Sequence, residues 1–211
     1  MDIYNERKPK VNKPVAAGVI SDNSYEDLEH ILQTATDLQD GIVYIVGEIL
    51  DTTLFDIIVR VRAIQAFREG DKYTGDPKAP ITFLINSPGG SVHDMLGIID
   101  FMDTLDTPIN TICRGTAFSA AAVILACGSG TRAMSKLSSA MFHQSLNYLE
   151  GKFNDVKASI AYSQLIETDV QNKLADVTKQ KDANWWKEKM KTDFFLSATE
   201  ALELGVIDVI L

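Results

Sequence analysis

The segment that most constrains this chain runs from residue 109 to residue 130, INTICRGTAFSAAAVILACGSG. Its first part, Ile109–Cys113, has the β-branched composition of a strand. The small residues of Arg114–Phe118 predict a turn, and Ala120–Cys127 predicts an apolar helix that ends at the next glycine. Ser119 stands where the turn becomes the helix. A strand that leads through a turn into a buried helix is typical of α/β proteins.

A serine at this point has two interpretations. The first N–H groups of a helix have no intrahelical acceptor, and the helix dipole places partial positive charge there. A nucleophilic Ser119 would therefore lie beside donors that can stabilise an oxyanion. However, serine is also a favoured N-cap, and the segment is not the G-x-S-x-G elbow of the α/β-hydrolases. The segment alone does not decide between nucleophile and cap.

Composition narrows the functional class. The 211 residues fit one domain, and 45% hydrophobic with 23% charged residues is ordinary for a globular protein. The net charge of −9 argues against nucleic acid or an anionic membrane as the main partner. Cys113 and Cys127 lie in apolar segments without C-x-x-C spacing, which favours buried free thiols over a disulfide. The polar first residues do not resemble a signal peptide, and no apolar run reaches the ~20 residues of a membrane span, so we expect a cytoplasmic protein.

Hydrophobic periodicity predicts strand–helix units along most of the chain. Residues 1–23 are expected to be an N-terminal arm, 24–211 a single domain, and 68–80 a polar loop. The expected helices are residues 24–38, 53–67, 92–102, 120–127, 152–177, 181–190 and 197–204. The expected strands are residues 41–47, 81–85, 109–113, 131–134, 139–142 and 206–211. This order predicts an α/β architecture with largely parallel strand pairing.

A glycine pair adds a candidate ligand-binding turn. Ser87–Gly90, Ser-Pro-Gly-Gly, follows a predicted strand, and its glycines would allow close approach of the backbone to a substrate carbonyl. A plain tight turn is the alternative. A phosphate loop is excluded because no G-K-[ST] follows.

Three histidines and one aspartate are the remaining candidates. His143 ends a predicted buried strand, His93 follows the glycine pair as a competing base, and His30 is expected at the surface. Asp193, beside an aromatic cluster, would orient an imidazole or simply lie at the surface. No metal-ligand pattern is present, so no metal site is expected.

Together these segments resemble one family, the caseinolytic protease proteolytic subunits, which are the ATP-dependent Clp serine peptidases (family S14). The family's N-S-P-G-G matches Asn86–Gly90, and its nucleophile segment resembles residues 111–121. Its histidine segment matches Met141–Gln144, and its acid segment, D-x-F-L-S-A-x-E-A, matches Asp193–Ala201. The four segments occur in the family's order, and the resemblance covers roughly Gly41–Leu211.

The resemblance implies a role for each matched residue. Ser119 would be the nucleophile, His143 the general base and Asp193 the acid that orients it. The backbone N–H groups of Gly90 and Ala120 would form the oxyanion hole. No cofactor or metal is implied.

The resemblance also implies a fold and an assembly. The fold would be the crotonase-like ββα spiral, with residues 152–177 as an extended handle helix between rings. The family's heptameric rings stack as a tetradecamer and receive unfolded polypeptides from a hexameric AAA+ ATPase. An endopeptidase inside such a chamber is therefore the expected function.

Several residues depart from the family pattern and keep alternatives open. Phe118 is bulkier than the usual residue, Ala120 replaces Met, Ser145 replaces Pro, and Thr192 replaces an Arg of the ring–ring contact. One alternative is a catalytically weak or structural ring subunit. Another is a different crotonase-like enzyme, either an acyl-CoA hydratase or a Ser–Lys peptidase with Lys136 as base.

Overall fold

A computed structural model describes residues 25–146 and 150–211, with side chains from residue 33 onward. The predicted arm, residues 1–23, lies outside the described residues, as does the side chain of His30. Asp37–Leu211 forms one compact unit, separate from Met1–Thr36. A single domain over residues 24–211 therefore stays a prediction.

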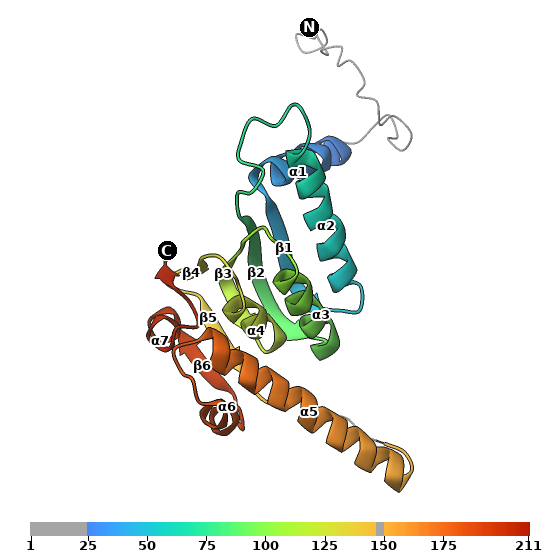
Figure 1. Ribbon diagram of the computed structural model, residues 1–211, viewed down its shortest axis with the longest axis vertical. Coiled ribbons are helices and arrows are strands. Elements are labelled where there is room, and N and C mark those ends of the chain that lie inside the picture. Colours follow the sequence, from blue (N-terminus) through green and yellow to red (C-terminus); the bar gives the residue numbers. More distant parts are fainter. Residues whose placement is uncertain (1–24, 147–149) are drawn as a thin grey trace, which may run out of the picture. The chain divides into compact units, whose positions relative to one another are not determined.

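Helices and strands alternate along the first part of the described chain, and further on β4 and β5, then α5 and α6, follow one another directly (Figure 1). The helices are α1 Tyr25–Asp40, α2 Thr53–Arg68, α3 Val92–Asp103, α4 Ala120–Ala126, α5 Phe153–Val177, α6 Ala183–Lys189 and α7 Ala198–Leu204. The strands are β1 Ile42–Ile49, β2 Ile81–Gly90, β3 Ile109–Phe118, β4 Arg132–Met134, β5 Ser139–Phe142, β6 Phe194–Ser197 and β7 Val209–Ile210. The predicted α/β class is confirmed.

The strands form one sheet that divides beside β3. The order is β1-β2-β3-β4-β7, and all of these pairs are parallel. The first half of β3 pairs with β4 over Thr111–Cys113, and its last residues pair with β5 over Thr116–Phe118. β6 then pairs antiparallel with β5. The division brings the ends of β3 and β5 and the start of β6 together.

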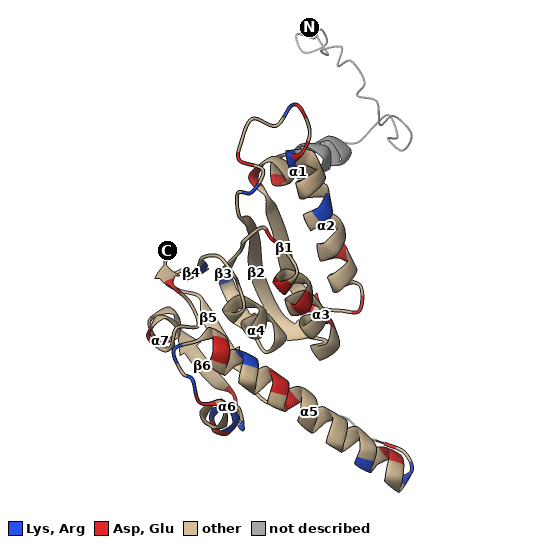
Figure 2. Cartoon of the chain, viewed as in Figure 1, with Lys and Arg blue, Asp and Glu red and all other residues tan. Residues whose placement is uncertain are grey.

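Helix α4 is the centre of the core. All seven of its residues, AAAVILA, are buried, and none carries a charge (Figure 2). A helix that is apolar on every side belongs inside a protein, and its alanines allow the neighbouring elements to approach closely. The packing of α4 in the core therefore fixes the position of its start, where Ser119 lies.

Two predicted turns proved to be strand. β2 continues through Ser87–Gly90, and β3 continues through Arg114–Phe118. Their pairing with neighbouring strands explains this, since Gly89 and Gly90 pair with β1 while Ser87 pairs with Ala117. Pairing with strands distant in the sequence thus outweighs the local preference of these residues for a turn.

The end of the chain also differs from expectation. The predicted final strand over residues 206–211 is reduced to β7, Val209–Ile210, and β6 was not predicted. The capping box at Ser197 is confirmed, with Glu200 as its partner.

Helix α5 has two unlike halves. Its C-terminal part buries Ile166, Val170 and Leu174, whereas its first part extends away from the sheet (Figure 1). Phe153 and Tyr162 are exposed there. Within the described ranges, no helix has both the length and the hydropathy needed to cross a bilayer.

Candidate active site

Backbone register brings the three predicted catalytic residues together. Phe118 pairs with Met141 between the parallel strands β3 and β5, so Ser119 leaves β3 beside the end of β5. Phe142 pairs with Phe194 between the antiparallel strands β5 and β6. In an antiparallel pair, the residue after one partner faces the residue before the other, so His143 faces Asp193. A slip of one residue in either pairing would separate the groups.

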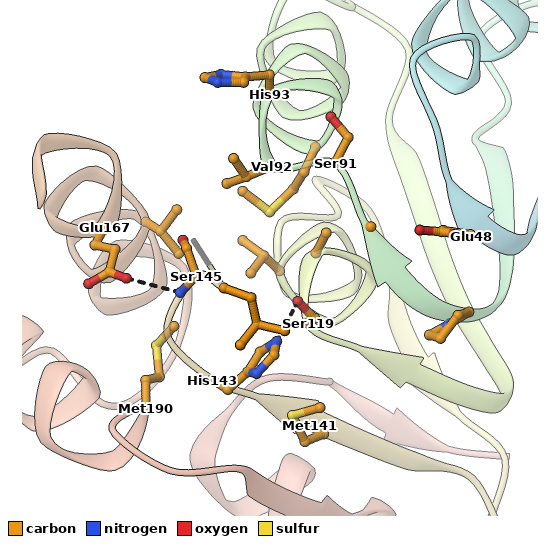
Figure 3. A pocket seen from close by; sticks show the side chains of 17 residues that line it. Glu48, Ser91, Val92, His93, Ser119, Met141, His143, Ser145, Glu167 and Met190 are labelled. Atoms are coloured by element: carbon orange, nitrogen blue, oxygen red, sulfur yellow. Dashed lines mark hydrogen bonds between the residues drawn. The ribbon is translucent and has the colours of Figure 1, made fainter. Parts of the chain in front are cut away.

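The side chains meet in the predicted order. His143 Nε2 lies 2.8 Å from Ser119 Oγ, as Figure 3 shows. His143 Nδ1 lies 3.4 Å from Asp193 Oδ1. The imidazole is largely buried, with 16% of its side chain exposed, whereas 59% of the Asp193 side chain is exposed. The nucleophile candidate is thus directly hydrogen-bonded to the base candidate, and the acid lies at the rim.

Ser119 does not act as a side-chain cap. It occupies the N-cap position of α4 but makes no capping hydrogen bond, because its hydroxyl contacts His143 instead. Its φ of 55° is positive, unlike that of every other non-glycine residue for which the structure describes the backbone. Such backbone conformations cost about 1–3 kcal/mol and concentrate at functional sites. The N-H of Ser119 donates to Met141 O at 2.7 Å, which holds this bend against β5.

The glycine pair lies against the serine. A Cβ atom on Gly89, whose φ is +96°, would lie 2.7 Å from Ser119 Cβ and 2.6 Å from Phe118 O. The N–H of Gly89 donates to Ser87 Oγ at 3.1 Å. The second glycine, Gly90, lines the same pocket as Ser119 and Ala120. The predicted oxyanion-hole residues are therefore near neighbours of Ser119 in space.

Ser119 and His143 open onto a pocket of about 540 Å³. Pro88 and Met141, from the predicted glycine and histidine segments, line it as well. Its other walls combine apolar and acidic groups that the sequence did not reveal, namely Val92, Met95, Val123, Leu146, Val170, Met190, Glu48 and Glu167. These residues come from distant segments, so only the folded chain brings them together.

The competing bases are not placed at Ser119. His93 lines the pocket from α3, where it stacks on Tyr162 with ring centroids 5.9 Å apart, and Figure 3 shows it away from Ser119. Lys136 is exposed and does not line the pocket. Among the two histidines with described side chains, only His143 contacts the serine.

Aromatic packing supports the histidine and the acid. The fully buried Trp186 of α6 packs on Phe142, the residue before His143, with centroids 5.2 Å apart. Phe118 packs edge-on against Phe195 of β6 at 5.7 Å. The bulky residue before Ser119 thus contributes to the β3–β6 packing and does not line the pocket.

The two cysteines are unsuited to nucleophilic chemistry. Both are free and buried. Burial raises the pKa of Cys113 to about 11 and that of Cys127 to about 12, so neither forms a thiolate readily near neutral pH. Among the described residues, no group of three His, Cys, Asp or Glu side chains could hold a metal ion.

Comparison with known proteins shows the family of the chain. The profile of the Clp protease family matches residues 28–211. The chain belongs to the Clp protease family. ATP-dependent Clp protease proteolytic subunit 1 of Prochlorococcus marinus (strain MIT 9312) is 33% identical over 175 residues, which cover 82% of this chain and 85% of the relative.

Two further relatives agree. ATP-dependent Clp protease proteolytic subunit 2 of Synechococcus sp. (strain CC9605) is 33% identical over 82% of this chain and 84% of the relative. The ATP-dependent Clp protease proteolytic subunit of Bacteroides thetaiotaomicron is 35% identical over 64% of this chain and 62% of the relative. The family resemblance inferred from the sequence is confirmed, the fold is consistent with it, and the protein is a serine peptidase of this family.

Proposed function

We propose that the protein is an endopeptidase that hydrolyses unfolded polypeptides with a Ser119–His143–Asp193 triad. The observation that carries the proposal is the 2.8 Å contact between His143 Nε2 and Ser119 Oγ at the floor of an open pocket. Nucleophile, base and orienting acid in this order are the arrangement of serine hydrolysis.

Each group has one task in the proposed reaction. With its proton on Nδ1, toward Asp193, the imidazole of His143 accepts the Ser119 proton at Nε2 as Oγ attacks the peptide carbonyl carbon. The C–N bond then breaks as the imidazolium gives that proton to the leaving amine. A water molecule hydrolyses the acyl-enzyme by the same route, which regenerates Ser119.

Gly90 and Ala120 are proposed as the oxyanion-hole donors. Ser91 N–H donates to Ile49 O of β1 at 2.8 Å. Successive N–H groups of an extended strand point to opposite sides, so that of Gly90 is directed away from β1. The N–H of Ala120 is the first of α4 and has no acceptor within its own helix. Both residues line the pocket beside Ser119.

We propose that the chain works as a ring, stacked or single, that an AAA+ ATPase supplies with substrate. The relatives' names include "ATP-dependent" and "proteolytic subunit", which supports such a partner. Residues 158–166 of α5 carry no charge, and this part of the helix exposes Ile160, Tyr162 and Leu165. This uncharged stretch suits contact with a second ring (Figure 2). The heptamer, the tetradecamer and the cytoplasmic location stay predictions.

Fluorophosphonate labelling tests the proposed triad. The reagent should add once to the wild-type protein, and the adduct should be absent from Ser119→Ala, as intact mass would show. Ser119→Ala should also stop peptide hydrolysis without unfolding the chain. A thiol reagent should leave the hydrolysis unchanged, because the thiols of both cysteines are buried and have raised pKa values.

Two results would contradict the proposal. Wild-type turnover in Ser119→Ala would place the nucleophile elsewhere. An assembled wild-type ring without an adduct would favour a structural subunit.

A further inference from the structure

The segment that follows His143 is held from two sides. Gln144 N–H donates to Met190 O at 2.8 Å, in the connection between α6 and the residue Asp193. Ser145 N–H donates to Glu167 Oε1 at 2.9 Å, and Figure 3 shows this bond as a dashed line. One anchor therefore comes from the Asp193 side and the other from helix α5.

Glu167 is well placed to fix this segment. It lies on α5 immediately after the buried Ile166 and one turn from the buried Val170, so the packed part of the helix sets its position. Its side chain is partly buried and lines the pocket. A hydrogen bond from a backbone N–H to a carboxylate is charge-assisted and stronger than one between neutral groups.

The hydrogen bond between Ser145 and Glu167 is made two residues after His143. β5 ends at Phe142, so His143 begins a segment without sheet pairing. The rotation of the imidazole toward Ser119 then depends on the backbone that follows it. Loss of one anchor allows a displacement of this backbone, and a displacement of about 1 Å costs on the order of 10²-fold in rate.

We propose that Glu167 is a positioning residue, which holds Ser145 and thereby keeps His143 in register with Ser119. The inference rests on the proposed triad. The hydrogen bond from Ser145 N–H to the Glu167 carboxylate thus links helix α5 directly to the segment that carries His143.

Four single variants and one double variant test the connection by the rate of fluorophosphonate labelling at Ser119. Glu167→Ala removes the acceptor and should lower the rate about tenfold or more. Ser145→Pro removes the donor but restores the proline of the family pattern, whose ring fixes φ, so it should stay within about threefold of the wild type, and Glu167→Ala should have no further effect in that background. Glu167→Gln keeps an oxygen acceptor and should stay within about threefold of the wild type. Asp169→Ala, an exposed acid on the same helix, is the matched control and should label normally.

Hydrogen exchange gives a readout that does not depend on activity. The amides that follow His143 should exchange faster in Glu167→Ala than in the wild type, and Glu167→Gln should restore the slow exchange. For small-peptide hydrolysis, Glu167→Ala should lower kcat more than it changes KM.

Distinct results would overturn the inference. Wild-type labelling in Glu167→Ala would overturn it, as would equal losses in Glu167→Gln and Glu167→Ala, or a loss from Glu167→Ala that persists in the Ser145→Pro background. A loss accompanied by a smaller sedimentation mass would assign Glu167 to assembly. A wild-type protein without a Ser119 adduct would overturn the proposed function itself, which separates the two failures.

Discussion

The two sides of the site are built differently. On the nucleophile side, Ser119 joins a buried strand to a fully buried helix, and the backbone of Gly89 packs against it. On the other side, His143 starts an unpaired segment and Asp193 is mostly exposed. The same sheet sets the register of all three, but Ser119 and His143 are partly buried whereas Asp193 is exposed. Substitutions beside Ser119 should therefore reduce activity and stability more than substitutions at Asp193.

Gly89→Ala should have the largest effect, because it acts on the buried side. The new Cβ would collide with Phe118 O and Ser119 Cβ at a position whose φ is +96°. We expect about 10²-fold slower fluorophosphonate labelling and a loss of about 2–4 kcal/mol in the free energy of unfolding. Labelling kinetics and urea denaturation measure the two effects.

Gly47→Ala is the matched control for backbone strain. Its φ of +79° is also positive, but a Cβ there meets nothing within 4 Å. It should cost only about 1–2 kcal/mol and leave labelling of Ser119 unchanged. If the two alanine variants behaved alike, the collision with Ser119 would not matter and the contrast between the two sides would fail.

Asp193→Asn should have an intermediate effect that is confined to catalysis. An asparagine cannot stabilise the imidazolium by charge, but solvent reaches this exposed position. We expect about 10- to 10²-fold slower peptide hydrolysis, compared with about 10⁴-fold for a buried triad acid. The free energy of unfolding should change by less than about 0.5 kcal/mol.

Glu188→Gln controls for the loss of an exposed charge near the site. Glu188 pairs with Lys191 in the connection that leads to Asp193. It should leave both hydrolysis and stability near the wild type. A 10⁴-fold loss in Asp193→Asn would show that the acid acts as a buried one, and would remove the proposed difference between the two sides.

The sequence singled out three residues that the fold brings together, but it revealed little of the pocket around them. Ser119, His143 and Asp193 each adjoin a short local pattern, so each was identified before the geometry was known. Glu167 and Met190 have no such local pattern and reach the pocket only through packing of α5 and α6. Their part in the site could not be predicted because it depends on tertiary contacts.

The fold shows the same division between local and long-range information. The element types followed from periodicity, and α5 was predicted to within one residue at its start. The predicted C-terminal ends of β2 and β3 were wrong. Ser-Pro-Gly-Gly and Arg-Gly-Thr have the composition of turns, but in the structure they continue the two strands and pair with neighbouring ones. β6 was missed because four residues give little periodicity and their partner strand, β5, is distant in sequence.

Asp208→Asn should have the smallest effect and should lower stability alone. Arg132 donates to both carboxylate oxygens of Asp208, from Nε at 3.0 Å and from Nη2 at 2.6 Å, and its Nη1 donates to the carbonyls of Ala126 and Val177. The hydrogen bond from Arg132 holds the pKa of Asp208 below its usual value. A lowered folded-state pKa stabilises the fold above the usual carboxyl pKa, and this contribution is lost as the pH falls through the folded value.

The asparagine variant should therefore be less stable than the wild type by about 0.5–1 kcal/mol near pH 7, because the pair is partly exposed. The difference should shrink as the pH falls below the usual carboxyl pKa, through the lowered pKa of Asp208, and disappear once the wild-type carboxyl is protonated. Urea denaturation across this range measures it, with labelling of Ser119 as the control. Asp208 contacts Arg132 of β4, whose guanidinium also donates to Val177 O of α5, and neither Asp208 nor Arg132 lines the pocket, so the labelling rate should not change. A slower rate would mean that this remote contact also sets the position of the triad. Burial alone would then not determine how strongly a substitution affects the site.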